Sequence, residues 1–112
     1  MEIKGKLILA GVAASGGVAR GKVKVITGIQ DSDSFEEGSI LVTRITDPTM
    51  VMMMAKSAAI VCDIGGLTSH PSIVSREMGI PCVVNAKTAT TILQDGQEIV
   101  VDGTAGKIYF AE

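Results

Sequence analysis

A strand, a glycine loop and a helix follow one another in the middle of this chain, and they constrain its fold more than any other feature. The apolar run from Ala58 to Cys62 suits a strand that is buried on both faces. The pair Gly65-Gly66 follows, and then a helix predicted over residues 70–78, with Gly79 as its C-terminal stop. This order aims the free backbone N–H groups of a helix N-terminus at a ligand.

The only histidine of the chain, His70, stands at that helix N-terminus. Free N–H groups and the positive end of the helix dipole favour an anion there, so a phosphoryl group on the imidazole would be stabilised. Ser69 is placed to be the N-cap, and Pro71 falls in the first turn, where its missing N–H costs no hydrogen bond. A phosphate carrier is therefore one interpretation of His70.

The other faces of this helix follow from its periodicity. Ile73, Val74 and Met78 share one side and are expected to pack inward. Arg76 lies on a different side from His70, so periodicity alone gives it no contact with a phosphate on that histidine.

Length and composition limit what the chain can do alone. Its 112 residues are expected to form one domain, 1–112, which is too short for a nucleotide-binding kinase and a second catalytic domain. Hydrophobic residues make up 46% and the net charge is −2, which indicates a globular protein without the basic excess of a nucleic-acid binder. No signal peptide, acylation motif or long apolar run is visible, so we expect no membrane role and a cytoplasmic location.

The remaining elements are read from alternation, caps and turns. We expect strands at 6–10, 22–26, 40–43 and 80–84, a helix opened by Asp47-Pro48 and running from Met50 to Lys56, a short helix at 88–93, and a hairpin of 97–101 and 107–110. The glycines between residues 11 and 21 are interpreted as tight turns, because the lysine and hydroxyl ending of a phosphate loop is missing.

Three further features have a structural and a functional interpretation. Cys62 and Cys82 lie in apolar runs and are interpreted as small buried hydrophobes, since the Cys-x2-Cys spacing of a metal site is absent. The methionines at 50–54 suit core filling, with an adaptable docking surface as the alternative. The acidic segment 30–39 lacks the spacing of a cation loop and is interpreted as a solvated connection, so no metal site is predicted in the chain.

Spacing alone does not decide the chemistry of His70. Ser69 beside it is a conceivable nucleophile, but no elbow motif is present, and general acid/base work by the histidine is open in principle. A neutral imidazole is a nucleophile near neutral pH, and a covalent intermediate splits one phosphoryl transfer into two easier steps. A merely structural histidine is equally open at this point.

A long motif decides between these alternatives. The run Gly65-Gly66-Leu67-Thr68-Ser69-His70, continued by Ser72-Ile73-Val74-Ser75-Arg76, resembles the phosphohistidine signature of the PEP-utilising enzymes: phosphoenolpyruvate synthase, pyruvate phosphate dikinase and enzyme I of the sugar phosphotransferase system. Residues 11–25, Asp47-Pro48 and residues 101–109 are similar, in the same order, to the glycine-rich opening, the Thr-Asp-Pro segment and the closing hairpin of their mobile domain.

The resemblance implies an α/β fold, a swivelling β/β/α domain of layered sheets with a few short helices. It implies that His70 is the phosphorylated nucleophile, that Thr68 and Ser69 orient the imidazole or its phosphate, and that Gly65 and Gly66 let the backbone approach closely. Arg76 matches the arginine of the motif, as a candidate loop or phosphate-binding residue.

The same resemblance implies partners. The phosphoryl group would pass between an ATP-grasp domain and a PEP-binding barrel domain, with Mg²⁺ in those partners and no cofactor bound by this domain itself. Homo-oligomers are left open. Because both partner domains are missing from this chain, it is expected to act in trans or as an excised part, without turnover of its own.

Three positions depart from the family pattern. Pro71 stands where alanine, serine or threonine is usual, Gly16 replaces a proline, and Asn85 stands where a glycine is common. None of them removes the nucleophile. The alternative function is a non-catalytic interaction or ligand-binding module that retains the swivelling fold, and a small hydrolase using His70 is a third hypothesis.

Overall fold

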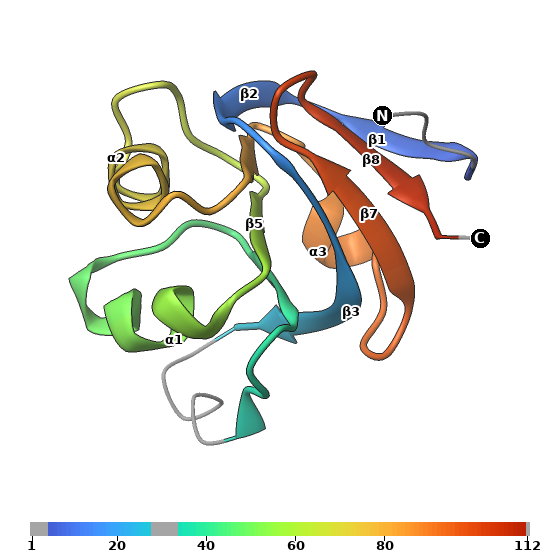
Figure 1. The fold of residues 1–112 in the computed structure, drawn as a ribbon, viewed down its shortest axis with the longest axis horizontal. Helices are drawn as coiled ribbons and strands as arrows, with labels where there is room; N and C mark the ends of the chain where they lie inside the picture. Colours follow the sequence, from blue (N-terminus) through green and yellow to red (C-terminus); the bar gives the residue numbers. More distant parts are fainter. Residues whose placement is uncertain (1–4, 28–33, 112) are drawn as a thin grey trace.

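The computed structural model describes residues 5–27 and 34–111, so Asp31 and Asp33 of the predicted acidic connection lie outside it. Eight strands form one sheet in the order β1-β8-β7-β3-β4-β5-β6-β2 (Figure 1). In chain order they are β1 (Leu7–Ala10), β2 (Val12–Ser15), β3 (Val18–Ile26), β4 (Ile40–Thr43), β5 (Ala59–Cys62), β6 (Cys82–Val84), β7 (Glu98–Asp102) and β8 (Lys107–Phe110). The helical elements are a 3₁₀ turn, η2 (Pro48–Met50), and the helices α1 (Val51–Lys56), α2 (His70–Met78) and α3 (Ala89–Ile92).

The sheet divides into two halves that share β3. In the antiparallel half, residues 18–22 of β3 pair with β7, β7 pairs with β8, and β8 pairs with β1. In the other half, residues 23–26 of β3 pair in parallel with β4, which is followed by β5 and β6, and β2 runs antiparallel to β6. The chain crosses between the halves at Gly11, where a Cβ would lie 2.4 Å from the carbonyl oxygen of Val84. Only glycine allows this crossing.

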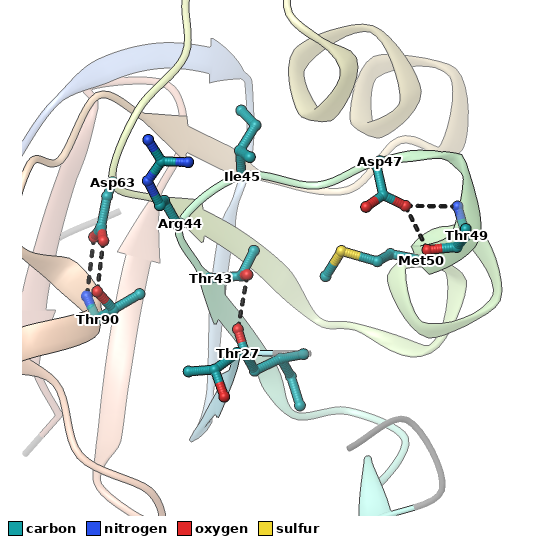
Figure 2. Close-up of a pocket in the computed structure, with 10 residues that line it drawn as sticks. Thr27, Thr43, Arg44, Ile45, Asp47, Thr49, Met50, Asp63 and Thr90 are labelled. Atoms are coloured by element: carbon teal, nitrogen blue, oxygen red, sulfur yellow. Dashed lines mark hydrogen bonds between the residues drawn. The ribbon is translucent and has the colours of Figure 1, made fainter. Parts of the chain in front are cut away.

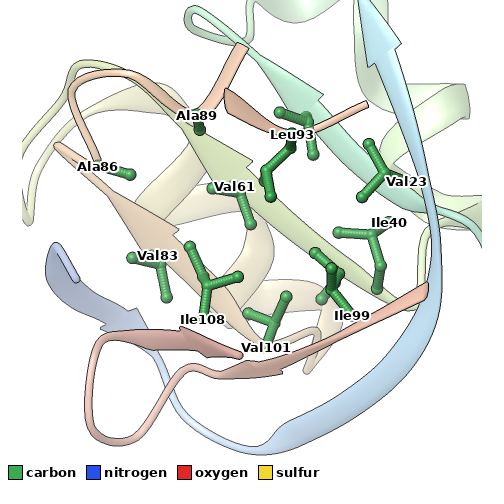
Figure 3. Packing of buried hydrophobic residues seen from close by; sticks show 12 residues of the cluster. Val23, Ile40, Val61, Val83, Ala86, Ala89, Leu93, Ile99, Val101 and Ile108 are labelled. Carbon is green, nitrogen blue, oxygen red and sulfur yellow. The ribbon is translucent and has the colours of Figure 1, made fainter. Parts of the chain in front are cut away.

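Apolar side chains fill the space between the two halves (Figure 3). Ile40, Val42 and Val61 from the parallel strands face Ile99 and Val101 of β7, and all five side chains are fully buried. Burial of one such side chain contributes about 1.5–3 kcal/mol. This inner core holds the two sheet halves together and fixes the register of the parallel strands.

The opposite face of the parallel half packs against α1 and α2, which completes three layers, β/β/α, as the resemblance implied (Figure 1). Its buried members include Leu41 and Ile60 from the strands and Met53 and Met54 from α1. The core interpretation of the methionines is confirmed for the buried ones, and it is wrong for Met52, which is 78% exposed. Cys62 and Cys82 are buried and free, as predicted.

Helix α2 faces the sheet with small side chains. Ser72 and Ser75 are fully buried, whereas Ile73 is exposed, so the expectation that Ile73 packs inward is wrong. Val74 and Met78 pack, as expected, against the buried cluster between the parallel strands and the helices α1 and α2. Two small serines let the helix lie close to β2 and β6, and Ser75 Oγ satisfies its hydrogen-bonding capacity by donating to the carbonyl of Ser72 at 3.2 Å.

Most predicted elements are confirmed to within one or two residues, including α2 with its left-handed Gly79. Asp47 accepts a hydrogen bond from the backbone N–H of Thr49 at 2.8 Å and so caps the turn that leads into α1. Strand β2 and the first half of β3 were not predicted, because they lie among the glycines interpreted as turns. Within the described ranges, the helices are too short to cross a membrane.

Candidate functional site

Four connections meet at one edge of the sheet. Strands β3, β4, β5 and β6 run in the same direction, so the segments that follow them lie at their common carboxyl edge. Helix α2 begins at this edge and places His70 there. In α/β sheets this edge is where ligands bind, because loops and helix N-termini converge on it.

One hydrogen bond holds the half-buried imidazole of His70: its Nδ1 lies 2.8 Å from Thr46 Oγ1. Thr46 is itself buried, so the surrounding packing restricts the movement of its hydroxyl. Within residues 5–27 and 34–111, Nε2 has no hydrogen-bond partner. A neutral imidazole that donates from Nδ1 keeps its lone pair on Nε2, so this ring has one nitrogen committed and the other available to react.

The neighbouring residue, Asp47, brings a negative charge towards His70. Its Oδ1 accepts hydrogen bonds from the hydroxyl and the backbone N–H of Thr49. The bond from the Thr49 hydroxyl makes the largest contribution, and together the two bonds hold the pKa of Asp47 below its ordinary value. The positive form of His70 lowers this pKa further. Asp47 is therefore ionised at neutral pH and carries a negative charge on the segment that contacts His70.

Two serine hydroxyls hold the loop before α2 in shape by hydrogen bonds to its backbone. Ser69 Oγ and Ser72 Oγ both donate to the carbonyl of Gly66, at 2.8 and 2.6 Å. Ser69 occupies the N-cap position but makes no side-chain cap hydrogen bond. Gly65 has φ +123°, and a Cβ there would lie 2.9 Å from Ser69 Oγ, whereas a Cβ on Gly66 would meet nothing within 4 Å. The first glycine thus shapes the loop, and the second leaves open space above it.

Arg76 fastens this loop to the sheet. Its Nε donates to the carbonyl of Ala14 in β2 at 2.7 Å, and its Nη2 donates to the carbonyl of Leu67 at 2.5 Å. Both partners are main-chain carbonyls, on a side of α2 away from His70. The geometry gives Arg76 a positioning role for the loop, and a contact with phosphate stays a prediction.

The structure brings most of the predicted site residues together, because Gly65, Gly66, Ser69 and His70 share one loop and helix start. Thr68 is exposed and makes no hydrogen bond with the described part of the chain, so its role stays a prediction. Thr46, which hydrogen-bonds the imidazole, was not among the predicted site residues.

A cleft of about 650 Å³ opens beside the site at the same edge (Figure 2). Ile45 and Asp47 form part of its wall, while Thr46 between them turns to His70, which does not line the cleft. Ten residues line it: Ile26, Thr27, Thr43, Arg44, Ile45, Asp47, Thr49, Met50, Asp63 and Thr90. Among the residues described, no group of three histidines, cysteines or acidic residues is placed to hold a metal ion.

Comparison with known proteins places this site in a family. Residues 35–106 match the family model of the PEP-utilising enzyme, mobile domain. The chain is 52% identical over 108 residues to a probable phosphoenolpyruvate synthase of Archaeoglobus fulgidus, covering 96% of this chain and 14% of that protein. It is 52% identical over 104 residues to the phosphoenolpyruvate synthase of Pyrococcus furiosus, covering 93% of this chain and 13% of that protein. The chain therefore spans about one seventh of the length of these relatives.

Solved structures with the same fold support the assignment. An Enzyme I (nEIt) protein solved by NMR superposes with a TM-score of 0.61 at 30% identity, over 71% of this chain and 33% of that one. The aconitase X of Thermococcus kodakaraensis has a TM-score of 0.67 at 19% identity, over 93% of this chain and 98% of that one, and shows the fold alone. The family match extends from before β4 to the closing hairpin and includes His70 with its loop. This chain belongs to the family of PEP-utilising enzyme mobile domains.

Proposed function

We propose that this chain is a phosphohistidine carrier, in which Nε2 of His70 accepts a phosphoryl group in one partner domain and delivers it in another. The hydrogen bond between His70 Nδ1 and Thr46 Oγ1 carries the proposal, because it leaves Nε2 as the nucleophilic atom at a helix N-terminus. The name phosphoenolpyruvate synthase supports a PEP-binding partner on one side, and the proposal adds a nucleotide-binding partner on the other.

The transfer step balances with the groups present. The Nε2 lone pair forms a bond to phosphorus while the bond from phosphorus to the leaving oxygen of the donor breaks, and that oxygen keeps the electron pair. The Nδ1 proton stays in its hydrogen bond with Thr46, so the ring becomes a phosphorylated imidazolium. Asp47 stabilises the positive ring, and the first N–H groups of α2 stabilise the phosphoryl oxygens.

The remaining predicted site residues fit around this step. Ser69 and Gly65 hold the loop in shape, and the open space above Gly66 lets a phosphoryl donor approach. The exposed hydroxyl of Thr68 is available to orient the phosphate. Partner domains of the ATP-grasp and barrel types would supply the nucleotide, the pyruvate and Mg²⁺, in the cytoplasm.

A chimaeric enzyme tests the carrier function. The 104 matched residues of the Pyrococcus furiosus synthase are replaced by the matching part of this chain, and this chimaera is called the host synthase below. Incubation with labelled ATP or labelled PEP should place acid-labile, base-stable phosphate on His70. A host synthase with His70→Ala should take no label, and label at another residue would contradict the proposal.

The cleft of Figure 2 favours a second candidate, a ligand-binding module without phosphoryl transfer. Its walls combine apolar side chains such as Ile26 and Met50 with the charged Arg44 and Asp63. In that case the chain would take no label from either donor, and it would bind its ligand equally well after His70→Ala.

A further inference from the structure

Large apolar side chains are exposed on the elements around His70. Among the residues described, Leu67 in the loop is 54% exposed and Ile73 on α2 is 44% exposed. Removing such apolar side chains from water is favourable, so a molecule that covered them would gain binding free energy. A contiguous apolar surface beside a reactive group is typical of a place where another molecule docks.

Helix geometry and one hydrogen bond place Ile73 on the side of α2 between His70 and the loop that carries Leu67. Because an α-helix turns by about 100° per residue, Ile73 lies about 60° around the helix from His70, and Arg76 lies about 60° further in the same direction. Arg76 binds the carbonyl of Leu67, so the loop runs along that side of α2. Ile73 therefore lies between His70 and the loop tip that carries Leu67.

The loop tip is also held in place before any partner arrives. The carbonyl of Gly66 accepts from two serine hydroxyls, and the carbonyl of Leu67 accepts from the guanidinium that also binds Ala14 of β2. A preorganised contact loses less conformational entropy on docking than a mobile one. The backbone at Leu67 is thus held in place at the start of α2, which carries His70.

Resting on the carrier function above, we propose that Leu67 and Ile73, here called the docking pair, form the apolar contact with each protein domain that exchanges a phosphoryl group with His70. Reacting atoms must approach to about 3 Å, so a domain that reaches Nε2 covers the side chains beside it. Apolar contacts are non-directional, so one pair serves two different partner surfaces. The synthase relatives have about six sevenths of their length outside the part that matches this chain, which leaves room for both partner domains.

The chain offers matched controls for this proposal. Leu7 on the edge strand β1 is 52% exposed, close to Leu67, and Ile92 on α3 is 47% exposed, close to Ile73. Neither belongs to the loop or to α2. Replacing these two residues changes the same residue types, at similar exposure, on elements other than the loop and α2.

The experiment compares two double variants in the host synthase: Leu67→Ser with Ile73→Ser, and Leu7→Ser with Ile92→Ser. Phosphoryl transfer from ATP to His70 and from His70 to pyruvate is measured in single turnovers. We expect both transfers to slow by about tenfold or more in the docking-pair variant, as loss of two apolar contacts implies, and to stay within about twofold of the unaltered host in the control. Labelling by phosphoramidate, a small phosphoryl donor that needs no docking, should be equal in all proteins.

Three results would overturn the proposal: equal rates in the two double variants, slowing of only one transfer, or a parallel loss of phosphoramidate labelling. The last would mean that the pair shapes the site and does not dock a partner. If the host with unaltered Leu67 and Ile73 takes no phosphate from ATP or phosphoramidate, the carrier function itself fails, and the docking proposal fails with it. If the host synthase takes the phosphate label but its docking-pair variant transfers phosphoryl groups equally fast, only the docking proposal is contradicted.

Discussion

Thr46 Oγ1 and His70 Nδ1 lie 2.8 Å apart although 24 residues separate them in the chain. The connection after β4 delivers the threonine, and the connection after β5 delivers the histidine. Their contact exists because β4 and β5 are parallel neighbours whose carboxyl ends share one edge. The orientation of the nucleophile is therefore a property of two loops packed together, and not of the histidine motif alone.

Replacing Thr46 by valine keeps the volume of the side chain and removes the hydroxyl. We expect phosphorylation of His70 in the host synthase to slow by about 10- to 100-fold, because a ring without its orienting partner populates the wrong tautomer and rotamer. Single-turnover labelling measures the rate, and nitrogen NMR of His70 reports the tautomer. Thr46→Ser restores the hydroxyl and should restore most of the rate, and a valine variant with an unchanged rate and tautomer would refute the role of this hydrogen bond.

The two glycines of the loop should respond differently to alanine. Gly65→Ala forces a side chain onto φ +123° and places its Cβ 2.9 Å from Ser69 Oγ. We expect a loss of about 1–3 kcal/mol in the free energy of unfolding, measured by urea denaturation. Gly66→Ala is the matched control, because its Cβ meets no atom within 4 Å, and its free energy of unfolding should change by about 0.5 kcal/mol or less. Equal losses at both positions would contradict the loop geometry.

Arg76 should act on the loop and not on the phosphate. Arg76→Met keeps the apolar stem and removes the donors to Ala14 and Leu67, so we expect hydrogen exchange in residues 65–69 to accelerate. The free energy of unfolding should fall by about 1–3 kcal/mol, as expected for hydrogen bonds from a charged group. Arg76→Lys separates the two roles: it keeps a charge for a phosphate but loses the second donor arm. If Arg76→Lys labels at the full rate and keeps slow exchange in residues 65–69, the positioning role is wrong.

The buried thiols predict how stability depends on alkaline pH. Burial raises the pKa of the Cys82 thiol from 9.0 to about 11, partly opposed by the nearby Ser75 side chain, and burial also raises the pKa of Cys62. A raised pKa means that the native state keeps a proton that the unfolded chain releases, so this contribution is complete below pH 9 and is lost as pH rises towards 11. Cys82 alone should cost about 2–3 kcal/mol over that window. Urea denaturation between pH 8 and pH 11 measures it, and Cys82→Ala should make the dependence less steep while the part due to Cys62 remains; an equally steep curve in that variant would contradict this origin.

The sequence predicted the elements whose signals are local. Helix α2 ends at Gly79 as expected, because a glycine there takes the left-handed conformation. Asn85, which departs from the glycine common in the family, has φ 54°, and asparagine is the residue that best replaces glycine in that region. The conformational preferences of single residues thus account for the backbone at Gly79 and Asn85.

The predictions that were wrong or missing concern residues at which tertiary packing overrides a local sequence signal. Ile73 reads as an inward apolar residue by periodicity, but the close approach of α2 to β2 and β6 requires the small Ser72 and Ser75 on that face. Strand β2 was hidden among glycines, since the strand with which it pairs, β6, lies about 70 residues later.

Only the part of the candidate site that is contiguous in the sequence could be predicted. The nucleophile and its loop are contiguous, so one motif carries them. The only available signal for Thr46 was its place directly before Asp47-Pro48, which resembles the Thr-Asp-Pro segment of the family. Its contact with His70 depends on strand order, which no local pattern encodes.

Site-resolved mapping of the phosphate on His70 tests the central claim most directly. The host synthase is incubated with labelled PEP, quenched in base, digested, and the labelled peptide is examined by phosphorus and nitrogen NMR. The account predicts one acid-labile phosphate, bonded to Nε2 of His70, with Nδ1 still protonated and no label after His70→Ala. Phosphate on Nδ1, or label that persists after His70→Ala, would contradict it.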